Sequence, residues 1–413
     1  MNRSMYKRIS FFSFIFISLN IQSASGTLDT TYGSNGTGIV TIAIGRANTL
    51  NAIAAQTDNS LVGVGSVTVT MTDSGISRFT TNGALNTSFT STGYAPLSIA
   101  TKTMFQTVAI QSNTDAVIAG YAGAREVNFA LARYTMLGAL DTTFGGGNGY
   151  VTTNIGSGGN INALLIQSDG KIVAGGVAVQ GSSQFALARY NTDGSLDTTF
   201  GTGGIVLTYM QYVSSINGLA LQIDGKILAA GLAWNGAVNE CALARYNTDG
   251  SLDTTFGNQG IVITAPGMWS QNQAVAVQTD GNIVVGGSTT NDGIHYSFVL
   301  MRYTTSGVLD TSFNGNGMVI TQMNYSATLN TLAIQSDGKI LAGGSNFGAR
   351  TTNFALARYL STGVLDTTFG TNGIALTTVG SSAQINSIII QSDSKIVVAG
   401  TSDDSAVLAR YLP

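Results

Sequence analysis

Six residues, Leu-Asp-Thr-Thr-Phe-Gly, recur through the chain and constrain its architecture more than any other feature. Their copies follow one another at steps of 55 to 57 residues. The copies, some with substitutions, begin at Leu28, Leu85, Leu140, Leu196, Leu252, Leu309 and Leu365. Such a constant period is typical of a repeat protein, in which each copy is one unit that packs against its neighbours. Seven units fill nearly all of the 413 residues and leave room only for a leader.

The first 25 residues differ in composition from the rest. Basic residues precede an apolar run at 11–19, and small residues follow it. This order is typical of a secretory signal peptide, and the run is shorter than the ~20 residues that span a bilayer. We expect residues 1–25 to be a signal peptide, with a retained membrane anchor as the alternative. Residues 26–413 then form one domain that is secreted, periplasmic or on the cell surface, with no integral membrane span.

Charge and cysteine usage exclude several kinds of partner. Only 9% of the residues are charged, the net charge is −3, and Lys and Arg form no cluster. Nucleic-acid binding draws on clustered basic residues, so we expect no nucleic-acid partner. The single cysteine, Cys241, stands where other repeats have Phe, and we expect it to be a buried small hydrophobe. No cofactor motif is present, and we expect a monomer.

Each repeat contains four short apolar or alternating runs, which predict four β-strands. In one repeat these runs are 204–208, 216–222, 226–231 and 241–246. Asp224-Gly225 joins the second run to the third, and Asp-Gly predicts a type I′ hairpin turn. Three prolines and the lack of helical periodicity make the chain all-β.

Seven four-stranded units predict a seven-bladed β-propeller, whose antiparallel blades stand around a central channel. A parallel β-helix is the alternative, although its coils repeat at shorter periods. The chain begins with a strand at 38–41 that lacks its three partners. It ends with a strand at 406–411, after which the last blade still lacks one strand. We therefore expect the N-terminal strand to join the C-terminal blade and close the ring, which hides two exposed sheet edges.

The longer motif Gln-x-Asp-Gly-Lys-Ile, followed by Phe-Ala-Leu-Ala-Arg-Tyr-x-x-Asp-Gly-x-Leu-Asp-x-x-Phe-Gly, resembles the bacterial delta-60 repeat family. The resemblance covers essentially all of the chain after the leader. It implies a secreted or surface β-propeller, and it supplies no catalytic residue that could be transferred to this chain. The second repeat departs from the motif, with Asn86 for Asp, Thr90 for Gly and no Asp-Gly turn.

An arginine ends the fourth run of each repeat, and an aspartate follows it in the Leu-Asp-Thr-Thr-Phe-Gly loop. The pairs that we expect are Arg133 with Asp141, Arg189 with Asp197, Arg245 with Asp253, Arg302 with Asp310, and Arg358 with Asp366. Because alternation puts each arginine on the face of buried Phe and Leu, its guanidinium needs a partner, and a bidentate fork with the aspartate would supply one. The alternatives are a charged ring that binds an anion, and calcium binding by the aspartate-rich turns. We favour structural pairs and Asx-turns, and no metal.

Connections in a meander alternate between the two faces of the disc. The repeated connections therefore share one face, and the variable connections share the other, where the chain is free to specialise. Exposed aromatic side chains on adaptable loops are typical of recognition surfaces, although these aromatics could instead cap the blade ends. The candidate ligand-binding residues are Tyr209, Tyr212, Trp234, Trp269, His295, Tyr296, Tyr325 and Phe347.

Catalysis has weaker support in the sequence. His295 has no nucleophile or metal partner nearby in the sequence, and the acidic residues of the variable loops are scattered over several repeats. Those acidic residues are Glu126, Glu240, Asp292, Asp403 and Asp404. We therefore expect a non-enzymatic binding or surface module for a protein or glycan ligand. The alternatives are a secreted carbohydrate-active hydrolase or lyase with two carboxylates at the channel mouth, and a structural repeat without a small ligand.

Overall fold

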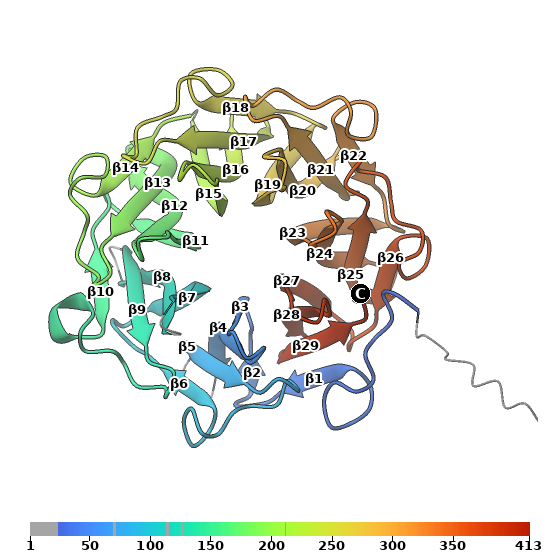
Figure 1. Cartoon of the computed structure of the whole chain (residues 1–413), viewed down its shortest axis with the longest axis horizontal. Coiled ribbons are helices and arrows are strands. Elements are labelled where there is room, and N and C mark those ends of the chain that lie inside the picture. The colour runs from blue at the N-terminus through green and yellow to red at the C-terminus, as the bar shows by residue number, and fades with distance from the viewer. Residues whose placement is uncertain (1–23, 69–71, 113–114, 125–126, 211) are drawn as a thin grey trace, which may run out of the picture.

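The computed structural model describes residues 24–413 apart from 69–71, 113–114, 125–126 and 211, and these residues form seven β-sheets set in a ring (Figure 1). We number the sheets as blades 1 to 7 in chain order. The seven-bladed propeller predicted from the repeat is confirmed. The predicted signal peptide falls almost wholly outside the described residues, so it stays a prediction. Within the described part of the chain, no helix has the length and apolarity needed to cross a membrane.

Every blade contains four main strands. Blade 1 has β2 (Ala47–Asn48), β3 (Ala52–Ala55), β4 (Leu61–Thr68), β5 (Thr72–Phe79) and β6 (Tyr94–Pro96), and blade 2 has β7 (Thr103–Ile110), β8 (Ala116–Ala122), β9 (Asn128–Tyr134) and β10 (Tyr150–Thr153). Blade 3 has β11 (Gly159–Ile166), β12 (Ile172–Gln180), β13 (Ser182–Tyr190) and β14 (Ile205–Thr208), and blade 4 has β15 (Val213–Leu221), β16 (Ile227–Trp234), β17 (Asn239–Tyr246) and β18 (Ile261–Thr264). Blade 5 has β19 (Trp269–Val277), β20 (Ile283–Thr290), β21 (Ser297–Tyr303) and β22 (Met318–Thr321), and blade 6 has β23 (Ser326–Ile334), β24 (Ile340–Phe347), β25 (Thr352–Tyr359) and β26 (Ile374–Thr377). Blade 7 has β27 (Ala383–Ile390), β28 (Ile396–Ser402), β29 (Ser405–Tyr411) and the N-terminal β1 (Ile39–Ile42), and one 3₁₀ turn, η1, spans Gly145–Gly147.

Within each blade the strands run antiparallel from the channel to the rim (Figure 1). The strand that follows the connection from the previous blade lies innermost, as β15 does in blade 4, and the short strand after the Leu-Asp-Thr-Thr-Phe-Gly loop lies outermost. A sequence repeat that is counted from its short strand is therefore offset from the blade by one strand.

The N-terminal strand closes the ring as predicted. β1 pairs antiparallel with β29, with Ile39 opposite Ala409 and Ile42 opposite Ala406. Residues more than 360 positions apart in the sequence therefore share one sheet, in which β1 covers the edge of β29 and is itself the outermost strand of blade 7.

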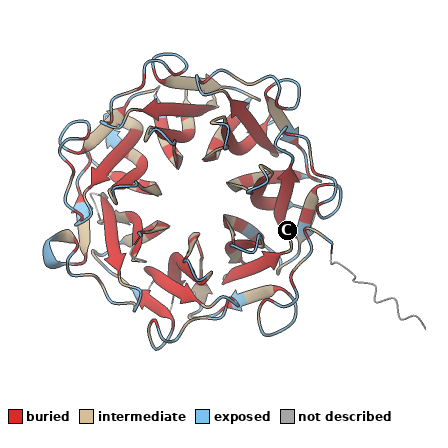
Figure 2. Cartoon of the chain, in the orientation of Figure 1, coloured by how far each residue is buried: buried red, intermediate tan, exposed pale blue. Residues whose placement is uncertain are grey.

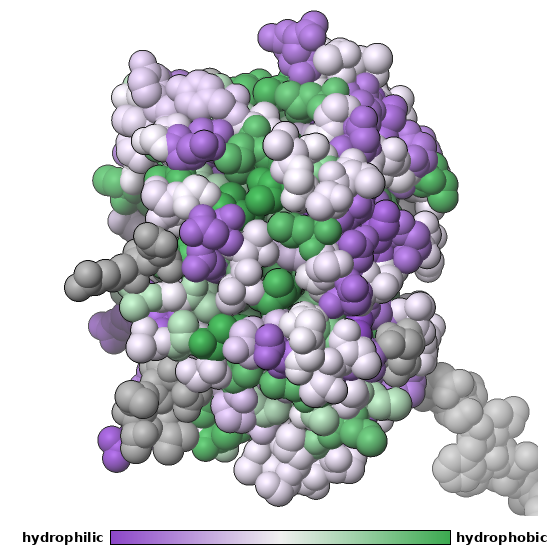
Figure 3. All heavy atoms as spheres, turned by 90° about the vertical axis from the view of Figure 1, so that its left-hand side faces the viewer, coloured by the Kyte–Doolittle hydropathy of each residue, from purple (hydrophilic) through white to green (hydrophobic). Residues whose placement is uncertain are grey.

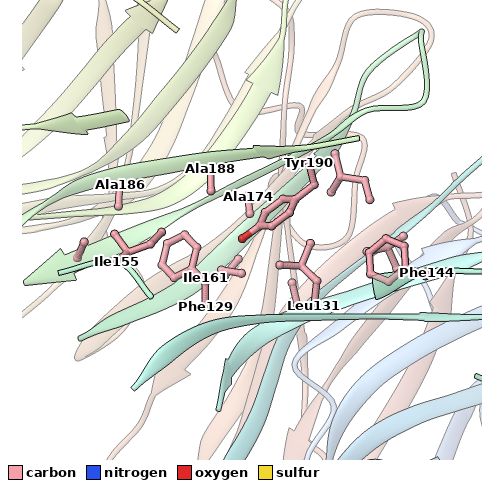
Figure 4. Packing of buried hydrophobic residues seen from close by; sticks show 13 residues of the cluster. Phe129, Leu131, Phe144, Ile155, Ile161, Ala174, Ala186, Ala188 and Tyr190 are labelled. Carbon is pink, nitrogen blue, oxygen red and sulfur yellow. The ribbon is translucent and has the colours of Figure 1, made fainter. Parts of the chain in front are cut away.

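The core lies between adjacent blades, and the middle strands are the most buried elements (Figure 2). Between blades 2 and 3, Phe129 and Leu131 of β9 pack against Ile161 and Ala174 of the next blade (Figure 4). Small residues on the middle strands let the sheets approach closely while the larger side chains interdigitate. Tyr190 is fully buried, and its hydroxyl donates to Thr153 Oγ1 of the preceding blade at 2.8 Å.

The rim does not present one continuous apolar surface on the side seen in Figure 3, where apolar and hydrophilic side chains alternate. Cys241 is 1% exposed, as the sequence predicted for a small hydrophobe. The strong preference of a buried thiol for its neutral form raises the pKa of Cys241.

The predicted type I′ turn at Asp-Gly is wrong. In blade 4, Gly225 N donates to Gln222 O at 2.9 Å, so Ile223 and Asp224 are the central turn residues. Neither has a positive φ, whereas Gly225 has φ of +81°. The turn is therefore type I followed by a glycine in the left-handed region, which is the usual three-residue hairpin.

Candidate functional site

The antiparallel order of the blades divides the connections between two faces. The hairpins at Asp-Gly and the Leu-Asp-Thr-Thr-Phe-Gly loops share one face, which we call the repeat face. The connections from outermost to innermost strands and from second to third strands share the opposite face, which we call the variable face.

On the repeat face, each arginine lies at the centre of a clamp that uses most of the repeated motif. Arg189 Nε donates to Asp197 Oδ2 at 2.7 Å, and Arg189 Nη2 donates to Thr199 Oγ1 at 3.4 Å. The guanidinium carbon lies 4.5 Å from the centre of the Phe200 ring, which is a cation–π distance. Arg189 Nη1 donates to Thr248 O of the next blade at 2.5 Å. The clamp therefore links two blades as well as two strands.

The predicted bidentate fork between arginine and aspartate is wrong. Only Nε of Arg189 meets Asp197, because Nη1 and Nη2 have partners of their own. The second oxygen of Asp197 accepts from Thr199 N and Oγ1, and Lys171 Nζ lies 3.0 Å from Oδ2. Burial raises the pKa of Asp197, but the hydrogen bonds from Thr199 and Lys171 and the charge of Arg189 outweigh it and hold that pKa well below its usual value.

Equivalent Arg–Asp contacts of 2.6 to 2.9 Å recur around the ring. They join Arg133 to Asp141, Arg189 to Asp197, Arg245 to Asp253, Arg302 to Asp310, Arg358 to Asp366, and Arg410 to Asp29. The last pair joins the two ends of the chain and reinforces ring closure. In blade 1 Asn86 replaces the aspartate, and Arg78 Nε is buried without a hydrogen-bond partner among the described residues.

The aspartates of the preceding turns serve the backbone. Asp193 Oδ1 accepts from Ser195 N at 2.9 Å and from Ser195 Oγ at 2.6 Å. This is an Asx-turn. No group of three or more His, Cys, Asp and Glu residues with metal-ligand geometry occurs in the part of the chain that the structure describes.

The variable face carries exposed aromatic side chains on consecutive blades. Tyr209 and Tyr212 are each 60% exposed before β15, and Trp269 is 40% exposed at the start of β19. Tyr325 and Phe347 follow on blade 6, at 55% and 39% exposed. We call the surface of Tyr209, Tyr212, Trp234, Trp269, His295, Tyr296, Tyr325 and Phe347 the aromatic face.

The structure brings four of these residues together in two pairs. Tyr212 and Trp234 pack edge to face, with ring centres 5.8 Å apart. Tyr212 comes from the connection between blades 3 and 4, and Trp234 ends β16. A side chain at Gly236 would meet the Tyr212 ring at 3.1 Å, so this glycine leaves room for the pair.

The second pair involves His295. The sequence suggested that this residue is isolated, but the structure places two partners beside it. His295 Nδ1 hydrogen-bonds Asp292 Oδ2, and the His295 ring packs edge to face on Tyr325 at 4.5 Å. Asp292 Oδ1 also accepts from the backbone N–H of His295 and Ile294 and from Thr290 Oγ1. The backbone and side-chain hydrogen bonds from His295 hold the pKa of Asp292 well below its usual value.

The remaining candidates make no aromatic ring contact with one another within the described part. Tyr209, Trp269 and Phe347 stay exposed, and Tyr296 is half-buried. Other large side chains near the variable connections are buried, namely Phe105 on β7 and Met323 between β22 and β23. The aromatic face thus combines exposed rings with capping residues. Arg125 and Glu126 lie outside the described residues.

The sequence-based candidates did not include an amide ring in the central channel. The channel encloses a cavity of about 660 Å³, and uncharged side chains and backbone line it. Asn51, Gln106, Asn162, Asn217, Gln273, Asn330 and Asn386 contribute one amide per blade. In six blades the amide residue is the extra residue of a β-bulge in the innermost strand.

Five of these amides join neighbouring blades. Asn217 Nδ2, for example, donates to Asn272 O of the next blade at 2.9 Å. The other four donors are Asn51, Asn162, Asn330 and Asn386, with distances of 2.8 to 3.0 Å. Gln106 and Gln273 make no such bond among the described residues. One Asn or Gln per repeat at nearly constant spacing is the sequence signal that could have revealed this ring.

The acidic residues of the variable loops that the structure describes, a set without Glu126, do not form a pair at the channel. Asp292 is engaged by His295, and Asp403 accepts from Ser381 Oγ at 2.5 Å. Asp404 is exposed, Glu240 lies on β17, and no Asp or Glu occurs among the described residues that line the channel.

Comparison with known families identifies the repeat. Residues 56–89, 167–200, 222–256, 278–313 and 335–369 match the model described as "Domain of unknown function (DUF5122) beta-propeller". The chain therefore carries five DUF5122 β-propeller repeats. The resemblance to the delta-60 repeat is confirmed by these five matches. No curated protein matches this DUF5122 propeller.

Solved structures show the same architecture at low sequence identity. An ulvan lyase, described as a new family of polysaccharide lyase, is 11% identical with a TM-score of 0.55, covering 90% of this chain and 96% of its own. A saccharide-bound structure of an ulvan lyase gives a TM-score of 0.53 at 11% identity, with 94% of each chain covered. A virginiamycin B lyase from Staphylococcus aureus is 12% identical with a TM-score of 0.48, covering 91% of this chain and 99% of its own. At these identities the likeness shows the fold alone.

Proposed function

We propose that this DUF5122 propeller is an exported binding module that takes a glycan chain on its aromatic face. The observation that carries the proposal is the exposure of aromatic rings on blades 4 to 6 of one face of a rigid ring. A Tyr or Trp ring in water loses favourable burial unless a ligand covers it. Exposed rings that follow one another over consecutive blades therefore favour an extended ligand.

The chemistry of the surrounding residues favours a glycan over a charged polymer. Sugars have apolar C–H faces, which stack on rings, and a rim of hydroxyls, which hydrogen-bond to neutral polar groups. The chain has a net charge of −3 and few charged residues of either sign, so it lacks the basic surface that a polyanion requires. Ser, Thr, Asn and Gly around the rings supply adaptable hydrogen bonds.

A glycan array with the purified protein tests this proposal. Tyr212→Ala with Trp234→Ala removes the packed pair, and we expect at least tenfold weaker retention of any bound glycan. Leu137→Ala with Ile223→Ala is the matched control, because both side chains are exposed on the repeat face, at 74% and 107%. Equal retention by both double variants, or binding of proteins and no glycan, would contradict the proposal.

A second candidate function is carbohydrate elimination by a lyase, and the Asp292–His295–Tyr325 cluster favours it. Asp292 orients the His295 ring through Nδ1, which leaves Nε2 free to accept a proton, and the ring packs on Tyr325. In such an elimination, a base removes the proton from the carbon next to the sugar carboxylate, and an acid protonates the leaving oxygen. His295 would be the base and the Tyr325 phenol the acid. Hydrolysis by two carboxylates has less support, because the described channel lining contains none.

The two functions separate in one assay. Incubation with polysaccharides that contain uronic acids should produce an ultraviolet-absorbing unsaturated sugar if the cluster is catalytic. His295→Ala and Tyr325→Phe should each abolish that product while glycan retention persists. Retention without any product from the unaltered protein would leave the binding module and refute the lyase.

A further inference from the structure

A glycine in the second strand of every blade fixes the backbone beside the amide ring. In blade 4 the bulge at Asn217 brings Ser215 O close to Gly231 of the neighbouring strand. A Cβ on Gly231 would lie 1.9 Å from that oxygen, so only glycine fits there. The equivalent glycines, where a Cβ would lie 1.9 or 2.0 Å from a carbonyl oxygen, are Gly65, Gly120, Gly176, Gly287, Gly344 and Gly400. The fold therefore holds one amide residue at the channel in each blade.

Two of the seven amide side chains differ from the rest. Gln106 in blade 2 and Gln273 in blade 5 are one methylene longer than the asparagines of the other blades. The asparagines donate Nδ2 to a backbone carbonyl of the next blade, whereas neither glutamine makes that bond among the described residues. Both glutamines line the channel cavity. Their carboxamides are thus available to a ligand.

The two glutamines come from nearly opposite walls of the channel. Blades 3 and 4 separate them on one side of the ring, and blades 6, 7 and 1 separate them on the other side (Figure 1). The cavity of about 660 Å³ between the blades has a size typical of small-molecule sites. A ligand in the channel can therefore meet a free carboxamide on each side.

The lining of the cavity is neutral. Its described residues include no Asp, Glu, Lys, Arg or His, so an ion in the channel would lose hydration without meeting an opposite charge. A carboxamide both donates and accepts hydrogen bonds, as a hydroxyl group does. Leu164, Leu219 and Val275 add aliphatic surface to the same cavity. Hydroxyl groups on an apolar carbon skeleton, the composition of a neutral sugar, match both parts of this lining.

We propose that the central channel is a second binding site, which takes a neutral sugar between Gln106 and Gln273. The sugar hydroxyls exchange hydrogen bonds with the two free carboxamides, while the asparagines keep neighbouring blades joined.

This sugar chemistry has two sources, a free monosaccharide or the end of a glycan that the aromatic face holds. Only the second source rests on the proposed function. Trp269 begins β19 on the variable face, and Gln273 lies four residues further along the same strand. At ~3.3 Å per residue, this separation is about 13 Å. A glycan on the aromatic face can thus extend one end into the channel.

Calorimetric titration with glucose, galactose, mannose and rhamnose tests the site, and glucuronate is the charged counterpart of glucose. Gln106→Met with Gln273→Met keeps the length of both side chains and removes their amides. For a free sugar, we expect this double variant to bind about tenfold more weakly because two hydrogen bonds are lost, and we expect no binding of glucuronate. The melting temperature should stay the same, since neither glutamine joins two blades in the described part of the chain. Gln180→Met is the matched control, because Gln180 is exposed at the end of β12.

The two sources give different results. A free sugar binds equally well to the unaltered protein and to Tyr212→Ala with Trp234→Ala, and this result would support the channel even if the aromatic face holds no glycan. If the ligand is the end of a glycan, no monosaccharide binds, and the double glutamine variant retains the glycan from the array about tenfold more weakly.

Three results would overturn the channel site. The first is that the double glutamine variant and the unaltered protein have equal affinity for every monosaccharide and for the glycan, or that neither binds any of them. The second is that glucuronate binds as tightly as glucose. The third is that the double glutamine variant melts at a temperature as low as Asn217→Ala, which loses a bond between blades, because the glutamines would then have a structural role.

Discussion

The clamp on the repeat face makes a quantitative prediction for one substitution, Asp197→Asn. The amide keeps the size of the carboxylate but removes its charge, which leaves the Arg189 guanidinium buried with a neutral partner. Both side chains are well shielded from water, at 8% and 6% exposed, so little solvent screening reduces the effect. Breaking a buried ion pair by removing one member costs about 3–5 kcal/mol.

This cost converts to a modest shift of the melting temperature because the ring is large. With an unfolding entropy of about 2.1 cal/mol/K per residue, the ~390 residues from position 24 onward give about 0.8 kcal/mol/K. A loss of about 3–5 kcal/mol then lowers the midpoint by about 4–6 °C if the ring unfolds cooperatively. A larger drop would mean that blades 3 and 4 unfold before the rest.

Differential scanning calorimetry of three proteins measures the shift. Asp193→Asn is the matched control, since the Asp193 side chain is exposed in the same loop and, among the described residues, accepts hydrogen bonds only from Ser195. A surface change of this kind alters stability by about 0.5 kcal/mol or less, which is below about 1 °C here. Equal midpoints for Asp197→Asn and Asp193→Asn would refute the view that the pair is a buried structural clamp.

Three further predictions concern ring closure, pH and the thiol. Asp29→Asn breaks the contact of Asp29 Oδ2 with Arg410 Nε at 2.9 Å, so amide hydrogen exchange should become faster in β1 than in β15, relative to the unaltered protein. Equal acceleration in both strands would contradict a role of this contact in ring closure. Burial raises the pKa of Asp29, but hydrogen bonds from Thr31 and Lys395 and the charge of Arg410 lower it to about 2 from 3.8. A carboxyl group with a lowered pKa stabilises the fold above pH ~4, and this contribution is lost as the pH falls toward ~2. The melting temperature should therefore drop across this window, and drop less in Asp29→Asn; a flat profile would contradict the prediction. Cys241 should react with a thiol reagent only at the rate of unfolding, because burial raises the pKa of its thiol and shields it; labelling of the native protein would contradict this.

Much of the fold could be predicted from the sequence because its strongest signals are local and repeated. The recurrence of Leu-Asp-Thr-Thr-Phe-Gly gives the number of blades, and the alternation of each run gives the strands. Ring closure followed from counting strands at the two ends, and β1 pairs with β29 as expected. Each of these predictions needed residue types and spacing, with no knowledge of side-chain direction.

The site details depended on geometry that spacing does not fix. The amide ring arises because Asn217 and its equivalents occupy bulge positions, and a bulge changes which way a side chain points. The bidentate fork failed because Thr199 and Thr248, neighbours in space, compete for the same guanidinium. His295 seemed isolated because its spacing of three residues from Asp292 does not show that the two side chains meet. The turn of this loop brings Asp292 back onto the His295 ring.

The aromatic face and the clamps lie on opposite faces of the disc. Clamps repeated around the repeat face stabilise the ring, and the exposed rings of blades 4 to 6 belong to connections that differ from blade to blade. We propose that the part of the sequence that repeats stabilises the ring and that the part that does not repeat recognises the ligand.

Hydrogen–deuterium exchange of the protein with and without a glycan from the array tests this division most directly. We predict slower exchange at 209–210, 212–213, 234–238, 267–270, 291–296 and 323–326, all on the variable face, with no change in the turns at 191–195 and 247–251. Protection centred on those repeat-face turns, with the aromatic connections unchanged, would contradict the account.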